Sequence, residues 1–140
     1  MKRAVIAVLG FVMVGCCAGA PPRAFADKPA CTASACAFLS PSRNISCEVD
    51  YQRGAGIPDE TYCQTNEPPA SVRLSTTGVV TNCTGVSCLG NAGIGTPVLA
   101  YGQTAGVGPF TCVSQTDGVT CTVDSGRGFT ISNGGITPIG

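Results

Sequence analysis

Cysteine is the residue type with the strongest chemical signal in this sequence. The chain has 140 residues, of which 10 are Cys and none is His. Thiols can form disulfides, bind metal ions or act as nucleophiles, and their spacing and context decide among these roles. Without His, this chain offers no Ser-His-Asp triad, no histidine base and no histidine-ligated metal.

The N-terminal segment determines how many of these cysteines can pair. A positively charged start (residues 1–3) precedes an uncharged apolar run (residues 4–15), and an A-x-A site ends at Ala26, directly before Asp27. This order predicts a secretory signal peptide over residues 1–26, cleaved between Ala26 and Asp27. The apolar run is too short for a membrane-spanning helix, which needs about 20 residues. We expect no transmembrane segment in the mature chain.

Cys16 offers an alternative processing site in the same segment. Gly15 is the small residue that lipid-modifying cleavage prefers before Cys16, although Met13 stands where Leu is usual. Cleavage at Ala26 leaves eight cysteines that can all pair, whereas cleavage before Cys16 leaves Cys17 as an odd thiol. We therefore expect an unanchored product, secreted or associated with the cell envelope, with a chain lipid-anchored at Cys16 as the alternative.

The eight remaining cysteines are expected to pair, because an exported chain meets an oxidising compartment. A hairpin turn over residues 115–118 would place Cys112 directly opposite Cys121, within reach of a bridge. The other pairs are expected from short separations along the chain, and other connectivities stay open. These pairs are Cys31–Cys36, Cys47–Cys63 and Cys83–Cys88.

A structural zinc site is the alternative role for some of these thiols. The C-x4-C spacing occurs at Cys31/Cys36 and again at Cys83/Cys88. This spacing lies at the edge of the usual range for zinc ligands, and export favours disulfides. We expect no metal and no other cofactor.

The surrounding sequence has the pattern of antiparallel hairpins. Residues 45–51 alternate apolar and polar side chains, which predicts a strand with one buried face. Asp117-Gly118 and Asn133-Gly134 are strong hairpin signals, and no long stretch has helical apolar spacing. We predict an all-β, disulfide-stabilised domain of antiparallel hairpins, sandwich-like or barrel-like. Strands are expected over residues 38–40, 45–51, 71–75, 79–83, 97–101, 110–114, 119–123, 128–132 and 136–139, with loops over 52–60 and 89–97.

The predicted organisation has three parts. Residues 1–26 are the signal peptide, residues 27–37 are an irregular N-terminal arm, and residues 38–140 are a single disulfide-rich β domain. The mature chain has five basic and eight acidic residues, so its net charge is mildly negative. A basic nucleic-acid-binding module is therefore excluded, because phosphate binding needs a surplus of Lys and Arg.

Catalytic arrangements are sparse in this sequence. Glu48 and Asp50 alternate on one face of a predicted strand, and paired carboxylates can hydrolyse glycosides when held at the right separation. We expect them instead to be polar residues on the solvent face of a half-buried strand. Ser and Thr are abundant, but the mature chain has no evident base to activate them. We therefore expect no enzymatic activity.

These observations favour a non-enzymatic interaction module that displays hairpin loops. Its partner would be a protein or an envelope component rather than nucleic acid, and we expect a monomer. An inhibitor of secreted hydrolases is the alternative, because such inhibitors also present rigid loops, and Ile57-Pro58-Asp59 would suit that role. A carbohydrate-active enzyme built on Glu48 and Asp50 ranks third.

An ordered set of motifs covers most of the mature chain. The motifs are Phe38-Leu39-Ser40-Pro41-Ser42-Arg43-Asn44-Ile45-Ser46-Cys47, Tyr62-Cys63, Leu99-Ala100-Tyr101-Gly102, Gly108-Pro109-Phe110-Thr111-Cys112, Gly118-Val119-Thr120-Cys121 and Gly126-Arg127-Gly128-Phe129. From about Phe38 to Ser132, the chain resembles a family of small exported proteins of mycobacteria and related actinobacteria, a domain of unknown function. The resemblance implies a bacterial envelope or extracellular location and brings no catalytic or binding residues. Relatives commonly carry Gly at the position of Arg43, so a non-Gly residue there argues against a tight left-handed turn.

Overall fold

The computed structural model of this protein describes residues 29–140. The predicted signal peptide, its cleavage site at Ala26–Asp27 and the alternative lipidation site at Cys16 lie outside the described residues. Within the described part of the chain, no helix is long and apolar enough to cross a membrane.

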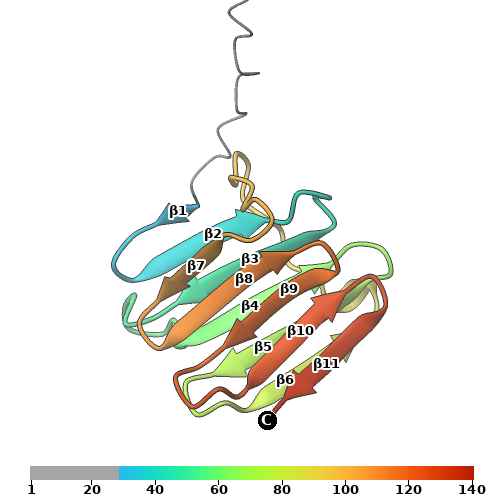
Figure 1. Ribbon diagram of the computed structural model, residues 1–140. Coiled ribbons are helices and arrows are strands. Elements are labelled where there is room, and N and C mark those ends of the chain that lie inside the picture. The colour runs from blue at the N-terminus through green and yellow to red at the C-terminus, as the bar shows by residue number, and fades with distance from the viewer. Residues whose placement is uncertain (1–28) are drawn as a thin grey trace, which may run out of the picture.

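The chain folds into two antiparallel β-sheets that face each other as a sandwich (Figure 1). The first sheet follows sequence order through Ala30–Cys31 (β1), Ala35–Leu39 (β2), Ile45–Asp50 (β3), Glu60–Thr65 (β4), Ala70–Ser75 (β5) and Val80–Thr84 (β6). The second sheet does the same through Thr104–Val107 (β7), Phe110–Gln115 (β8), Gly118–Thr122 (β9), Gly128–Ser132 (β10) and Gly135–Ile139 (β11). Along the chain, the connection from β6 to β7 begins with a short 3-10 helix, Val86–Cys88 (η1). The all-β prediction is confirmed.

The hairpins with strong turn signals form in the predicted register. In the β8–β9 hairpin, Cys112 pairs with Cys121 and Ser114 pairs with Val119. The β10–β11 hairpin reverses at Asn133-Gly134, between Ser132 and Gly135. Since each turn is two residues long and rich in Asn, Asp and Gly, the local sequence alone sets the register of both hairpins.

The strand pattern differs from the prediction in three places. Strands β4 and β7 form where no strand was expected, and residues 97–101 make only an isolated parallel bridge between Val98 and Leu39. Strand β4 was missed because its buried side chains include Thr61 and Thr65, so apolar residues do not alternate with polar ones. Its strand conformation comes from pairing with both β3 and β5.

The N-terminal arm, predicted to be irregular over residues 27–37, is partly strand. Strand β1 and the start of β2 lie within it, and Cys36 is only 1 % exposed. Two pairings explain the difference, because β2 pairs with β3 along its whole length and the Cys31–Cys36 disulfide joins β1 to β2. The described end of the arm therefore belongs to the first sheet.

The β2–β3 turn is left-handed at Arg43, whose φ is 60°. The expectation based on a non-Gly residue is therefore wrong. The N–H of Arg43 donates to the Ser40 carbonyl (2.8 Å), and Ser40 Oγ accepts the N–H of Ile45 (3.1 Å). These hydrogen bonds hold the turn in a conformation that costs a non-Gly residue about 1–2 kcal/mol.

The core lies between the two sheets and is built from aromatic rings, aliphatic side chains and sulfur. Phe38, Phe110 and Phe129 are each at most 1 % exposed. At the centre, Cys63 Sγ of the first sheet lies 3.8 Å from Cys121 Sγ of the second. Both sulfurs are already in disulfides, so this is a packing contact between two bridges.

We predict that Gly128→Ala destabilises the sandwich by about 1–3 kcal/mol, the usual cost of forcing extra atoms into a packed site. A Cβ at Gly128 would collide with the Cys121 carbonyl and lie 2.8 Å from Thr122 Cα. Both are backbone atoms of β9, so no side chain can move aside. The free energy of unfolding from urea denaturation is the measurement.

Gly134→Ala is the matched control, because a Cβ there meets nothing closer than Ser132 Oγ at 3.5 Å. We expect this variant to unfold within about 0.5 kcal/mol of the wild type. Equal stabilities for the two variants would contradict the proposed close approach of β9 and β10.

Candidate functional site

All eight cysteines between residues 29 and 140 are in disulfides, as the sequence predicts. The four bridges are Cys31–Cys36, Cys47–Cys63, Cys83–Cys88 and Cys112–Cys121. Two of them lie in the core, one on the inner face of each sheet. The other two close short loops at opposite edges of the first sheet, so the structure does not bring the two C-x4-C pairs together as a shared zinc site.

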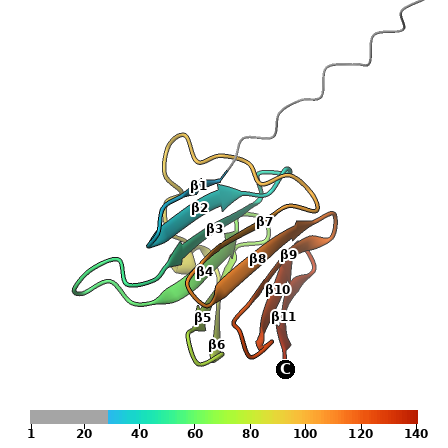
Figure 2. The same ribbon diagram turned by 60° about the vertical axis from the view of Figure 1, so that its left-hand side comes forward.

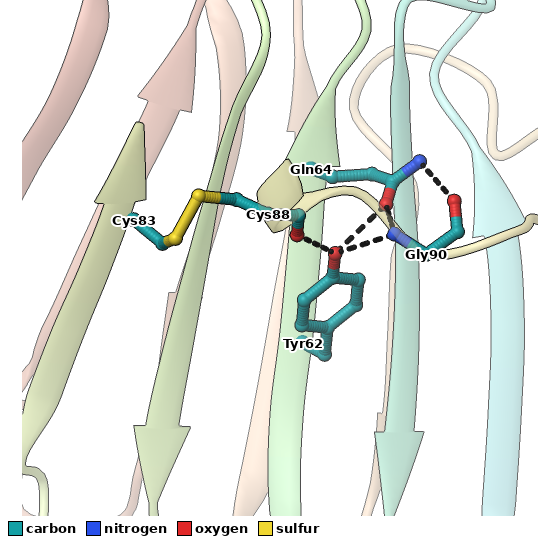
Figure 3. The surroundings of a disulfide bond; sticks show 5 residues. All are labelled: Tyr62, Gln64, Cys83, Cys88 and Gly90. Carbon is teal, nitrogen blue, oxygen red and sulfur yellow. Dashed lines mark hydrogen bonds between the residues drawn. A yellow bond between two sulfur atoms is a disulfide. The ribbon is translucent and has the colours of Figure 1, made fainter. Parts of the chain in front are cut away.

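The Cys83–Cys88 disulfide turns the chain back over the outer face of the first sheet (Figure 3). There the Tyr62 hydroxyl lies 2.9 Å from the Cys88 carbonyl and accepts the N–H of Gly90 at 3.0 Å. Gln64 Oε1 also accepts this N–H, at 2.7 Å, while Gln64 Nε2 donates to the Gly90 carbonyl at 3.0 Å. Two outward-facing side chains of β4 thus tie the connection between the sheets to the first sheet.

This covering segment forms one wall of a polar groove of about 370 Å³, which we call the sheet groove. Its floor is the outer face of β3, β4 and β5, and its other wall is the chain from Ser87 to Gly90. The floor residues are Glu48, Asp50, Glu60, Tyr62 and Arg73. The candidate carboxylates Glu48 and Asp50 therefore lie on the outer face, as predicted.

The charges of the sheet groove are mostly paired. Arg53 Nη1 donates to Glu48 Oε1 (2.7 Å) and to Asp50 Oδ1 (2.9 Å), and these bonds, that to Asp50 first, raise the pKa of Arg53. Arg73 forms an ion pair with Glu60 and lies over the ring of Tyr62, 5.0 Å from its centroid. Glu48 and Asp50 thus share one guanidinium in an ion-pair network on the outer face of β3.

A second cavity, which we call the loop-end cavity, has a volume of about 270 Å³ and lies where turns of both sheets meet. The β2–β3 turn, the β8–β9 turn and the β10–β11 turn surround it, together with Tyr101. Its polar lining includes Ser42, Gln115, Thr116, Asp117 and Asn133.

Asn44 fixes the frame of the loop-end cavity. Its Nδ2 donates to the Glu67 carbonyl (2.8 Å) and to Asn133 Oδ1 (2.7 Å), and its Oδ1 accepts the N–H of Glu67 (2.9 Å). One side chain thereby connects two turns of the first sheet with a turn of the second. Two of the three turns around the cavity, β2–β3 and β10–β11, are therefore joined to each other without a ligand.

The groups inside the loop-end cavity are available for binding. Tyr101 is 49 % exposed. Asp117 is exposed in the β8–β9 turn, and within residues 29–140 it forms no salt bridge. An exposed ring beside unpaired polar groups can supply both apolar contact and hydrogen bonds to a partner.

The candidate inhibitor segment lies in the loop between β3 and β4. Figure 2 shows this loop projecting away from both sheets. Residues 52–58 are all exposed, and Ile57 is 40 % exposed. The N–H of Gln52 donates to Asp59 Oδ1 at 2.7 Å and closes the base of the loop.

Sequence reasoning singled out neither the Tyr62 network nor the loop-end cavity as a site. From the sequence alone, Tyr62 and Tyr101 are named as parts of the motifs that carry the family resemblance, and Asp117 is named as a residue of a hairpin turn. No single-sequence signal could have joined Tyr62 to Gly90, since they are 28 residues apart.

Together, the fold and these surfaces define a disulfide-stabilised β-sandwich with a fixed cavity at one end. No protein-family model, curated protein or solved structure matches this chain. The geometry of its own residues therefore carries the functional argument.

We predict that Tyr62→Phe loosens the segment over the sheet groove. Loss of the hydroxyl removes the contacts to Cys88 and Gly90, at a cost of about 1 kcal/mol. The amide of Gly90 should then exchange with solvent about five-fold faster, as measured by hydrogen–deuterium exchange. Tyr101→Phe, at the other cavity, is the matched control and should leave Gly90 unchanged. Unaltered exchange at Gly90 in Tyr62→Phe would show that this network does not hold the segment.

Proposed function

We propose that this chain is an exported, non-enzymatic interaction module, secreted or associated with the cell envelope. The observation that carries the proposal is the complete pairing of the eight described cysteines into four disulfides. Bridges at this density are typical of proteins that fold in an oxidising compartment. The signal-peptide pattern of residues 1–26 and the resemblance to exported actinobacterial proteins support the same destination.

The loop-end cavity is the surface that best fits a partner. Binding residues are often found on loops that a rigid scaffold positions, and a preformed site avoids the entropy cost of ordering on binding. Asn44 supplies that rigidity, while Tyr101 and Asp117 supply groups for contact. Its partner is a protein or an envelope component that presents hydrogen-bonding groups together with an apolar face.

Inhibition of a secreted hydrolase is the second candidate, and the projecting β3–β4 loop favours it. This loop is fully exposed over residues 52–58, and the Cys47–Cys63 bridge joins the two strands that carry it. Such a loop could enter the cleft of a hydrolase. The two candidates use opposite ends of the sandwich, so variants can separate them.

We predict that Tyr101→Ala combined with Asp117→Asn lowers binding to purified actinobacterial cell walls at least five-fold in a sedimentation assay. A five-fold loss corresponds to about 1 kcal/mol, which is the effect expected if Tyr101, an aromatic residue of the kind enriched among the few residues that dominate an interface, contacts the partner. Asp124→Asn, in the β9–β10 turn at the opposite end, is the matched control and should bind like the wild type.

Ile57→Ala tests the inhibitor candidate in the same assay and against secreted hydrolases. One outcome favours the inhibitor role over the interaction module. In it, Ile57→Ala abolishes inhibition of a hydrolase, while the double variant at Tyr101 and Asp117 sediments with cell walls as the wild type does. If the wild type neither sediments with cell walls nor inhibits a hydrolase, both candidates fail.

We predict that the mature protein begins at Asp27, because the A-x-A site ends at Ala26. Intact-mass spectrometry of the protein recovered from culture filtrate and from membranes measures this directly. An acylated Cys16 at the N-terminus would instead establish the lipid-anchored form of the same domain.

A further inference from the structure

The polar side chains of the loop-end cavity keep hydrogen-bonding groups that the fold does not use. Asn133 Oδ1 accepts from Asn44 Nδ2 (2.7 Å), and Gln115 Oε1 accepts from Thr120 Oγ1 (3.2 Å). Within residues 29–140 neither amide NH2 group has a partner, so both are free donors. The carboxylate of Asp117 lines the same cavity and, in that part of the chain, is a free acceptor.

Free donors beside a free acceptor match the hydroxyl groups of a ligand. A hydroxyl donates one hydrogen bond and accepts others, so neighbouring hydroxyls can donate to Asp117 and accept from Gln115 and Asn133. A phosphate can only accept, and Asp117 would repel it. An ammonium group can only donate, which leaves both amides unmatched. The hydrogen-bonding groups of the cavity therefore favour an uncharged ligand that is rich in hydroxyl groups.

The charge of the lining favours the same kind of ligand. No Lys or Arg lines the loop-end cavity, and Arg43 of the β2–β3 turn is not among the lining residues. Recognition of phosphate and carboxylate groups relies on these two residue types. Anionic polymers of a cell envelope therefore fit the cavity less well than neutral ones.

Tyr101 supplies an apolar surface beside these polar groups. It is 49 % exposed, whereas Ile45, the other large apolar residue of the lining, is only 3 % exposed. A sugar ring has a face of C–H groups and an edge of hydroxyls. The face of an aromatic ring is electron-rich, so it attracts C–H groups, and the hydroxyls remain free for the polar side chains.

A peptide fits this cavity less well than a sugar. Extended peptides commonly bind by adding a strand to the edge of a sheet. The edge strands of the two sheets are β1, β6, β7 and β11, and none of their residues lines the cavity. With Ile45 buried, the cavity also has no apolar pocket for a peptide side chain.

We infer that the loop-end cavity binds a terminal sugar of a neutral polysaccharide of the cell envelope. Tyr101 stacks on the sugar ring, Asp117 accepts from its hydroxyls, and the amides of Gln115 and Asn133 donate to them. The volume of about 270 Å³ lies just below the range for drug-sized ligands, which begins at about 300 Å³, so the cavity takes the end of a chain. The inference rests on the proposed function, because it names the envelope component that the interaction module binds.

The test is a titration of the ¹⁵N-labelled, disulfide-bonded protein with neutral oligosaccharides, followed by NMR. The oligosaccharides are released from purified actinobacterial cell walls by mild acid and freed of charged fragments on ion-exchange resins. We expect the amide signals of Gly118 and Gly134, which line the cavity, to shift, and that of Gly90 in the sheet groove to stay in place. No shift at the cavity would overturn the inference.

Salt separates a neutral ligand from a charged one. Raising NaCl from about 0.05 M to about 0.5 M should change the affinity for the oligosaccharides less than two-fold, because salt screens interactions between charges and the ligand has none. A steep loss of affinity with salt would show that charge drives binding and would overturn the inference.

Substitutions locate the contacts. Tyr101→Ala and Asp117→Ala should each lower the affinity for the oligosaccharides about five-fold or more. Tyr101→Phe keeps the ring and should bind within two-fold of the wild type, and Asp124→Ala removes a carboxylate from the exposed β9–β10 turn and should do the same. If Tyr101→Phe binds as weakly as Tyr101→Ala, stacking on this ring is wrong.

Treated cell walls separate a sugar ligand from a protein ligand in the sedimentation assay. Periodate cleaves sugars that carry neighbouring hydroxyls and should abolish sedimentation of the wild type, whereas protease treatment of the walls should not. The reverse result would overturn the sugar inference and leave an interaction module with a protein partner. Failure to sediment even with untreated walls would overturn both the inference and the cell-wall role of the cavity.

Discussion

The contact between two disulfides at the centre of the sandwich is the interaction on which the rest of this structure depends. Strand β4 contributes Thr61, Cys63 and Thr65 to the interior and no large apolar side chain. The Cys47–Cys63 bridge fills that space, and across the core it meets the Cys112–Cys121 bridge of the second sheet. Sulfur thus does part of the packing that Leu, Ile and Val do in a larger core, in a domain whose size limits how much apolar surface it can bury.

The connection between the sheets contributes to both the sheet groove and the loop-end cavity. After β6 the chain passes over the outer face of the first sheet, where Tyr62 and Gln64 hold Gly90. It then runs beside Leu39, paired through Val98, and delivers Tyr101 to the loop-end cavity. The Cys83–Cys88 bridge lies at the start of this path, where Cys88 and Gly90 line the sheet groove.

The sequence predicted best those features that depend on neighbours along the chain. The β8–β9 hairpin, its register and the Cys112–Cys121 bridge all follow from Asp117-Gly118 between residues of high β propensity. Strand β4 was missed because pairing with β3 and β5 imposes its conformation on a polar sequence. Arg43 adopts a left-handed conformation that its residue type disfavours, because hydrogen bonds at Ser40 hold the turn.

The sequence by itself therefore determined the all-β class, the hairpin turns and the Cys112–Cys121 bridge, and left the connectivity of the other six cysteines open. Local periodicity and turn chemistry specify these features, since each involves only a strand and its neighbour. Only the tertiary structure decided that the two central bridges touch, that Asn44 reaches Asn133 across 89 residues, and that the hydroxyls of Thr61 and Ser114 are buried without a hydrogen-bond partner. These relationships depend on how two separately formed sheets pack face to face. Such packing is set by the combined shape of both inner faces, which no local pattern contains.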